Sequence, residues 1–377
     1  MLQEPLDSGT AERLVAAVAE AMDVESYRQP VPKKAKRAAG WPGDVALEIR
    51  GRLRLPSERA YDLVAERFRG LGFVAFFRRA GNGEVLVLAV PGELPSEGGG
   101  VRLPAILFLA TMASVIFVGA LNSAEPDGRL DVASGLVYAG SLLAILVAHE
   151  MGHYLTARRM GMPASLPYFI PMPLPPLGTF GAAMVMKAPP RNRRGLLALG
   201  AAGPVAGLVV AVPVLMLGLL QSQVSRIPID QPTIQEGNSL LYLGVKYLLF
   251  GRILPSGGID VFLGPMAWAG WVGLLVTGLN LVPAGQLDGG HVLYAFLGAR
   301  ARTVVWFIVA VLVLLATRWE GWLLWVGVIL VFGRVHAVPL DDVTPLSGRE
   351  RLFALFMLVV ALLVFIPVPM LVQGPLG

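Results

Sequence analysis

The most prominent pattern in the chain is a series of long apolar runs that begins at residue 103. A helix needs about 20 mainly apolar residues to cross a bilayer, and most of the runs approach or exceed that length. The fifth and sixth runs are short enough to form one tight hairpin. The pattern therefore predicts a polytopic α-helical membrane protein with six to seven transmembrane helices, in the runs 103–121, 132–157, 195–221, 262–283, 303–317, 321–333 and 352–372.

The polar N-terminal part has the pattern of a small soluble α+β domain. Apolar residues at helical spacing alternate there with short β-type runs, and turn residues separate them. The predicted elements are a short helix (11–22), a strand (45–49), a second helix that Ser57 caps (57–71) and a β-hairpin that turns at Asn82 (72–90).

Two linkers divide the chain into four parts. A core of about fifty residues is marginal alone, so we expect the soluble domain to pack on another part. This domain has no histidine and no catalytic constellation, and we expect it to regulate access rather than take part in chemistry. The predicted division is an N-terminal helix with a basic linker (1–42), the small α+β domain (43–94), a Gly-rich linker (95–102) and a membrane-embedded domain (103–377).

Six prolines between residues 163 and 176 forbid a regular helix after the second apolar run. The segment is still apolar, so we expect it to be re-entrant and to border protein or a water-filled cavity. Residues 179–186 then have the pattern of a strand. Two interpretations of this strand stay open: an exposed edge to which an extended substrate adds, or a packing loop.

The composition supports a membrane protein, with 55% hydrophobic residues, 15% charged residues and a mean hydropathy of +0.65. The polar N-terminus gives no sign of a cleavable signal peptide. A net charge of +5 is typical of basic loops beside a membrane, and no nucleic-acid-binding motif accompanies it. Because cysteine is absent, disulfides and thiolate metal ligands are excluded.

The distribution of basic residues orients the apolar runs. Segment 158–194 has six basic residues and no acidic one, which indicates the cytoplasmic side. Loop 122–131 has three acidic residues against one arginine, which suits the outside. We therefore expect a cytoplasmic N-terminal domain, and an integral protein of a bacterial inner membrane.

The second apolar run contains the motif His149-Glu150-Met151-Gly152-His153 near its cytoplasmic end. On a helix, positions i and i+4 share a face, so both imidazoles are placed to bind one Zn²⁺. Glu150 is then placed beside the remaining coordination position, as a general base. Ionisable residues inside a membrane span are costly and indicate function, so a chance match is the weaker interpretation.

A catalytic zinc usually has a third protein ligand. The fourth run returns to the cytoplasmic side and brings Asp288 to the level of His153, while Pro283 and Gly289 let the backbone bend. Asp288 is therefore either the third ligand or a cap of the next helix. We expect His291 to lie beside the site, with ligation as the alternative, and His336 to be an interfacial residue.

Together these motifs resemble the site-2 protease family of intramembrane zinc metalloproteases, and most closely its branch without PDZ domains, found in bacteria, archaea and chloroplasts. The loop 222–261 is too short for a PDZ domain. The matching residues are the His149–His153 motif, Asn280, Pro283, Leu287-Asp288-Gly289, Gly178-Thr179-Phe180-Gly181, Ala202-Gly203-Pro204 and the segment 340–345.

The resemblance implies that His149, His153 and Asp288 hold one Zn²⁺ per chain, that Glu150 is the general base and that Asn280 steadies the oxyanion. The implied substrate is a membrane protein whose transmembrane segment is locally unwound within the lipid bilayer. The alternative function is metal transport or scaffolding by a non-proteolytic membrane protein. A transporter would have acidic or histidine residues along several spans, whereas here they cluster at one depth.

Overall fold

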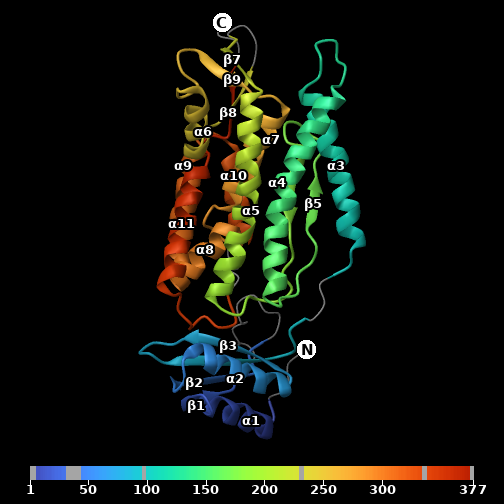
Figure 1. Ribbon diagram of the computed structural model, residues 1–377. Helices are drawn as coiled ribbons and strands as arrows, with labels where there is room; N and C mark the ends of the chain where they lie inside the picture. Colours follow the sequence, from blue (N-terminus) through green and yellow to red (C-terminus); the bar gives the residue numbers. More distant parts are fainter. Residues whose placement is uncertain (1–5, 31–43, 96–98, 229–232, 333–337, 374–377) are drawn as a thin grey trace.

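The computed structural model describes residues 6–30, 44–95, 99–228, 233–332 and 338–373. A small soluble domain, which contains the N-terminal elements, lies at one end of a bundle of long helices (Figure 1). The two parts touch each other through the loops at that end of the bundle. The arrangement agrees with the expectation that the soluble domain packs on another part of the chain.

The soluble domain is built on a four-stranded antiparallel sheet in the order β1-β2-β4-β3, so β1 and β3 are its edge strands. Its core includes Leu14, Ile49, Phe68 and Phe77. Its elements are α1 (Ser8–Ala19), β1 (Met22–Arg28), β2 (Leu47–Leu53), α2 (Ser57–Gly70), β3 (Phe73–Arg79) and β4 (Val85–Pro91).

The predicted hairpin is present, and Asn82 adopts the left-handed backbone conformation (φ 59°) that its turn requires. Strand β1, in contrast, has no predicted counterpart, because most of its residues are exposed and its alternation of apolar and polar residues is interrupted by a register shift between Val24 and Ser26. Since α1 and β1 share the core of the sheet, we propose that the soluble domain begins at α1.

The predicted capping role of Ser57 is wrong. Ser57 is the first residue of α2, and Pro56 occupies the capping position without a side-chain hydrogen bond. The Ser57 hydroxyl instead lies 2.8 Å from the Thr344 hydroxyl, in a loop of the membrane domain. A partner 287 residues away in sequence therefore takes the place of the local bond.

The membrane domain is a helical bundle in which α4 packs on α3, α5 and α7, and α5 packs on α4, α7 and α8. Tyr138 of α4, Leu215 of α5 and Trp271 of α7 are buried in its main core. Its helices are α3 (Arg102–Asn122), α4 (Val132–Arg159), α5 (Arg193–Leu220), α7 (Pro265–Asn280), α8 (Asp288–Leu297), α9 (Ala301–Leu315), α10 (Gly321–Phe332) and α11 (Gly348–Val364), with the short 3-10 helix η2 (Gly298–Arg300) between α8 and α9.

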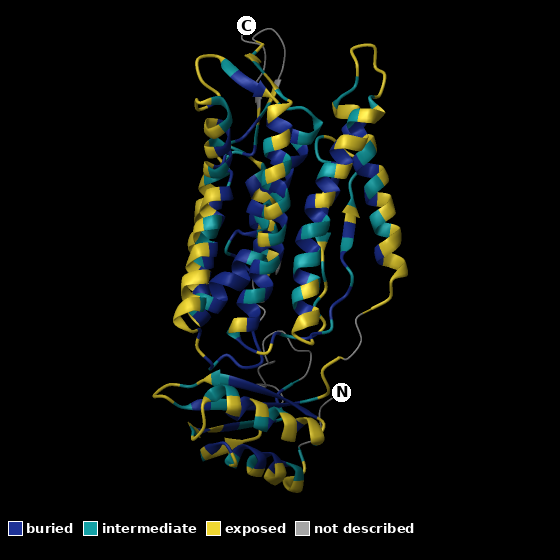
Figure 2. Ribbon diagram, in the orientation of Figure 1, coloured by how far each residue is buried: buried dark blue, intermediate teal, exposed yellow. Residues whose placement is uncertain are grey.

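Four helical stretches in the described part of the chain are long and apolar enough to cross a membrane: α3, α4, α5 and the stretch Asp288–Leu315. Helices α7 and α11, of 16 and 17 residues, are shorter than the usual span. Large apolar side chains such as Ile106, Phe307 and Leu362 are exposed on the outside of the bundle. Figure 2 shows this exposure along the outer faces of α3, α9 and α11, a surface suited to lipid.

The proline-rich segment after α4 contains no helix, as predicted, and forms two strands that pair antiparallel, β5 (Tyr168–Pro171) and β6 (Thr179–Ala183). Strand β5 runs beside α3 within the layer of the long helices (Figure 1). The predicted strand 179–186 thus corresponds to β6. The sequence indicated the strand, but not its partner β5.

The opposite end of the bundle is covered by short elements that the sequence pattern did not predict. Strand β7 pairs with β9, strand β8 pairs with β10, and helix α6 lies beside them (Figure 1). Their bounds are β7 (Gln223–Arg226), β8 (Thr233–Glu236), α6 (Leu240–Phe250), β9 (Ile259–Phe262) and β10 (Met370–Gln373).

Candidate metal centre

Helix α4 brings two buried imidazoles to one point. The Asp131 side chain caps the start of this helix by accepting a hydrogen bond from the Ser134 N–H (3.0 Å), and the apolar sequence then continues without proline. His149 and His153 are one turn apart and only 3% and 8% exposed. Their Nε2 atoms lie 3.2 Å from each other, as the spacing in the sequence predicts.

Asp288 reaches the same point from the opposite side of the site. After α7 ends at Asn280, a short turn leads to α8, whose first residue is Asp288. Its Oδ2 atom lies 3.2 Å from His149 Nε2 and 3.3 Å from His153 Nε2. Leu287 holds the capping position of α8, without a side-chain hydrogen bond. Of the two interpretations of Asp288, the geometry therefore favours the ligand over the cap.

These three donor atoms have the spacing of a tetrahedral metal site. With metal–ligand bonds of about 2.0–2.2 Å, two corners of a tetrahedron are about 3.3–3.6 Å apart. The three observed separations are 3.2, 3.2 and 3.3 Å. A carboxylate and two imidazoles, all nitrogen and oxygen donors, also suit a divalent transition metal such as zinc.

Helix α5 shapes the other wall of the site with glycines. A Cβ atom on Gly203 would lie 2.0 Å from His153 Nε2, and one on Gly207 would lie 3.2 Å from His149 Nδ1. Glycines in an apolar helix usually allow close contact between helices. In the structure the atoms they admit are the imidazoles themselves, a role that their helical spacing towards one face could have indicated.

The backbone of α5 also orients one imidazole. His153 Nδ1 lies 2.9 Å from the carbonyl oxygen of Leu199, to which it donates when protonated at this atom. That tautomer leaves the Nε2 lone pair directed to the Asp288 side. The sequence gave no signal for this contact, because a backbone carbonyl belongs to every residue type.

The other candidate residues lie close by. Glu150 is buried on α4, and the Asn280 Nδ2 atom is 3.5 Å from His149 Nε2. Their catalytic roles remain predictions. His291 is buried on α8, but the group of potential ligands found among the described residues consists of His149, His153 and Asp288. His336 lies outside the described residues.

The part of the chain that contains this arrangement resembles a known protein family. Residues 137–316 match the sequence profile of Peptidase family M50. The matched stretch includes His149, His153 and Asp288. The predicted resemblance to the site-2 protease family is thereby confirmed, and the chain is an integral membrane protein.

Three curated relatives from plants illustrate the similarity to proteins named as zinc metalloproteases. The chain is 32% identical over 241 residues to the probable zinc metalloprotease EGY2, chloroplastic, of Arabidopsis thaliana, covering 62% of this chain and 42% of the relative. It is 30% identical over 294 residues to the probable zinc metalloprotease EGY1, chloroplastic, of the same plant, covering 70% and 52%. It is 27% identical over 284 residues to EGY3 of Oryza sativa subsp. japonica, covering 70% and 48%.

The chain thus spans about half the length of the curated relatives that it matches. These relatives are consistent with the predicted branch of the family, which lacks PDZ domains. No solved structure gives a significant match.

Proposed function

We propose that this chain is an intramembrane zinc metalloprotease that hydrolyses peptide bonds within or near the transmembrane segments of membrane proteins. The observation that supports this proposal most directly is the convergence of His149, His153 and Asp288 within 3.2–3.3 Å of one another inside an apolar bundle. The match of this domain to Peptidase family M50 and the names of its relatives support the same activity and the same metal.

In this proposal the two histidines and Asp288 hold one Zn²⁺. When bound, zinc supplies a Lewis acid that polarises a peptide carbonyl and lowers the pKa of a coordinated water. Glu150 takes the proton of the attacking water and passes it to the leaving amine. Asn280, whose Nδ2 atom points to the site beside His149, donates a hydrogen bond to the developing oxyanion.

Strand β6 is proposed as the place where the substrate is held. A transmembrane helix has its backbone carbonyls occupied, so the segment to be cleaved has to unwind first. Strand β6 is paired with β5 on one side, and its Phe180 side chain is 67% exposed. An extended substrate that adds to β6 would gain backbone hydrogen bonds without side-chain specificity. This favours the substrate edge over the packing loop.

The orientation in the membrane is proposed from charge and from the position of the site. The soluble domain lies at the end of the bundle where α4 ends in Arg158 and Arg159 (Figure 1). We therefore place the soluble domain and this end of the bundle on the cytoplasmic side of a bacterial membrane. The chain has no cysteine. A cysteine at exposed Asp127 should react with an impermeant maleimide in intact cells, and one at Glu93 should not. Reversed labelling would overturn the orientation.

The proposed activity is tested with the full chain in proteoliposomes that contain a model transmembrane substrate. Glu150→Gln should abolish cleavage while the zinc content stays near that of the unaltered protein, because the residue serves as base and not as ligand. Glu93→Gln, on the soluble domain, is the matched control and should cleave normally. Zinc binding without proteolysis by the unaltered chain, across substrates with unwound segments, would favour metal transport or scaffolding instead.

A further inference from the structure

A short segment of the membrane domain, residues 340–344, extends the sheet of the soluble domain. We call it the docking strand. It lies parallel to the edge strand β3: the Phe77 N–H donates to the Leu340 carbonyl (2.9 Å), and the Asp342 N–H donates to the Phe77 carbonyl (3.1 Å). The Arg78 guanidinium donates to the carbonyls of Pro339 (2.9 Å) and Leu340 (3.0 Å). An edge strand is a ready template for such an addition.

The docking strand is held on its other side by the membrane domain. The Leu340 N–H donates to the Pro190 carbonyl (2.9 Å), and the Asp341 N–H donates to the Arg191 carbonyl (2.7 Å). The Leu340 side chain is buried in the core of the soluble domain. The segment therefore belongs to the soluble sheet through one edge and to the entrance of α5 through the other.

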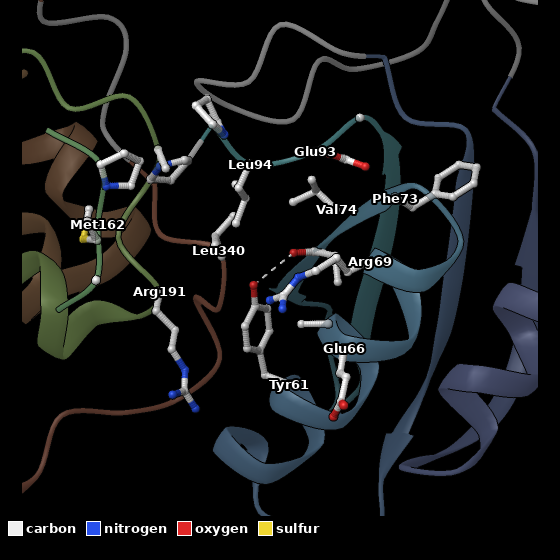
Figure 3. A pocket seen from close by; sticks show the side chains of 18 of the residues that line it. Tyr61, Glu66, Arg69, Phe73, Val74, Glu93, Leu94, Met162, Arg191 and Leu340 are labelled. Carbon is white, nitrogen blue, oxygen red and sulfur yellow. Dashed lines mark hydrogen bonds between the residues drawn. The ribbon is translucent and has the colours of Figure 1, made fainter. Parts of the chain in front are cut away.

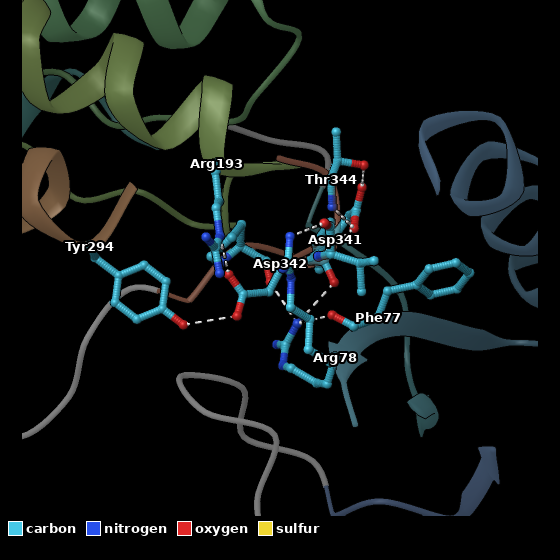
Figure 4. A network of polar contacts seen from close by, with 11 residues as sticks. Phe77, Arg78, Arg193, Tyr294, Asp341, Asp342 and Thr344 are labelled. Atoms are coloured by element: carbon cyan, nitrogen blue, oxygen red, sulfur yellow. Dashed lines mark hydrogen bonds and ion pairs between the residues drawn. The ribbon is translucent and has the colours of Figure 1, made fainter. Parts of the chain in front are cut away.

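Asp342 extends this connection to two helices of the metal centre. Its carboxylate accepts hydrogen bonds from Arg193 Nε (2.8 Å), on the first turn of α5, and from the Tyr294 hydroxyl (3.1 Å), on α8 (Figure 4). Arg193 is six residues before Leu199, and Tyr294 is six residues after Asp288. Six residues are about 9 Å of helix, so both anchors are within two turns of a residue that shapes the site.

Part of the interface is not closely packed. Beside the docking strand, a cavity of about 520 Å³ separates α2 and β3 from the turn that follows α4. Tyr61, Leu94, Met162 and Arg191 line it, as Figure 3 shows. Two ion pairs, Arg191 with Asp62 and Arg194 with Glu58, also cross the interface, but their side chains are about half exposed. Because exposed ion pairs contribute little, the docking strand carries much of the attachment.

We propose that the docking strand couples the soluble domain to the metal centre, with Asp342 and Tyr294 as positioning residues for Asp288. While the soluble domain is docked, Asp342 is fixed between β3 and the start of α5, and it holds α8 and α5 at the spacing that the three metal ligands require. When the domain detaches, Asp342 loses its support on one side and the ligand separations relax. This inference rests on the proposed metal centre, and it gives the soluble domain a supporting role outside the chemistry.

The test uses the full chain, because the absence of cysteine allows one engineered disulfide to report on docking. The Ser57 and Thr344 hydroxyls are 2.8 Å apart, so the pair Ser57→Cys and Thr344→Cys should cross-link when the domain is docked. Arg78→Ala, added to this pair, removes the hydrogen bonds to Pro339 and Leu340 and should slow cross-linking. In the reduced form, the zinc affinity of this Arg78→Ala variant should be about tenfold lower than that of the cysteine pair alone. Competition with a chelator measures this affinity.

Oxidation of the Arg78→Ala variant should then restore the zinc affinity, which general misfolding of the domain would not allow. Arg50→Ala, on the inner strand β2, where the side chain is half exposed and forms an ion pair with Glu84, is the matched control and should change neither quantity. Tyr294→Phe keeps the ring and removes the hydroxyl, so it should weaken zinc binding without changing the rate of cross-linking.

The outcomes separate this inference from the proposed function. If the unaltered chain binds no zinc, both are rejected. If it binds zinc, and Arg78→Ala slows cross-linking without weakening zinc binding, the coupling alone is rejected. The same conclusion follows if oxidation leaves the affinity low, or if Tyr294→Phe binds zinc as tightly as the unaltered protein.

Discussion

Two buried polar clusters lie towards opposite ends of the membrane domain, and the protein balances their charges differently (Figure 1). At the end away from the soluble domain, Lys246 Nζ lies 3.2 Å from Glu236 and 3.4 Å from Asp260. The Tyr242 hydroxyl also donates to Glu236 (2.9 Å), and Gln235 donates to Asp260 (3.1 Å). Each carboxylate of this outer cluster therefore has donors supplied by the chain.

The metal centre has the opposite property. Its two Nε2 atoms and the Asp288 carboxylate face one another at 3.2–3.3 Å, and all three are acceptors when both neutral imidazoles are protonated at Nδ1. In that state the chain supplies no donor between them, and a cation is suited to hold them at this spacing. The difference teaches that burial of ionisable groups does not by itself identify a site. A cluster whose charges the chain balances has a structural explanation, whereas a cluster of acceptors facing one another is a candidate metal site.

Removing the charge of Asp288 is the strongest test of the difference between the metal centre and the outer cluster. Asp288→Asn keeps the shape of the side chain, but it should reduce zinc content and proteolysis together, with activity lower by at least about a thousandfold. Zinc content is measured by elemental analysis, and activity is measured on a transmembrane substrate. Asp260→Asn, in the outer cluster, is the matched control and should keep its zinc. Full zinc content and activity in Asp288→Ala would defeat the assignment of Asp288 as ligand.

A change of charge in the outer cluster should lower the stability of the fold and leave zinc binding at the metal centre unchanged. Lys246→Met leaves Glu236 and Asp260 buried without their cation, which should lower the free energy of unfolding by about 3–5 kcal/mol. Denaturant titration in mild detergent gives this quantity. The folded fraction should bind zinc normally. Weakened zinc binding at unchanged stability would mean that the outer cluster is linked to the site.

Metal binding should also depend on the room that the glycines of α5 leave for the two imidazoles. Gly203→Ala adds a Cβ atom 2.0 Å from His153 Nε2, so the imidazole has to move and zinc affinity should fall about 10- to 100-fold. Chelator competition measures the loss. Gly140→Ala on α4, where a Cβ would meet no atom within 4 Å, is the control. Equal affinity in the two variants would show that α5 leaves the ring room to adjust.

The smallest expected effect is the pH dependence of the outer cluster. Burial raises the pKa of Glu236 above its ordinary value of 4.5, although Lys246 opposes the shift. The folded state therefore holds this proton better than the unfolded state. The resulting stability is fully present below the ordinary pKa and is lost as the pH rises through the raised one.

Glu236→Gln should flatten this decline by about 1 kcal/mol or less. Thermal unfolding of both proteins between pH 4 and pH 8 measures the difference, and Glu25→Gln, on an exposed edge strand, should keep the decline of the unaltered protein. An equal slope in Glu236→Gln and the unaltered chain would assign the pH dependence to other groups.

The features that were predictable from sequence are those that depend on neighbouring residues. The hairpin at Asn82 follows from the backbone conformation of its turn, and the strand β6 follows from the break that prolines impose before it. The prediction that Ser57 caps α2 failed because its hydroxyl has a partner in another domain. Strand β1 was missed because its alternation of apolar and polar residues is short and is interrupted between Val24 and Ser26.

In the candidate site, the spacing of four residues places His149 and His153 on one face of an apolar helix, and this follows from local geometry alone. The depth of Asp288 in the membrane also indicated this residue. The folded structure was needed to show that the Asp288 carboxylate lies 3.2 Å from an imidazole 139 residues away, that the Leu199 carbonyl orients His153, and that residues 340–344 join the soluble sheet. Local periodicity sets the face of a helix, but the packing of helices distant in sequence sets which faces meet.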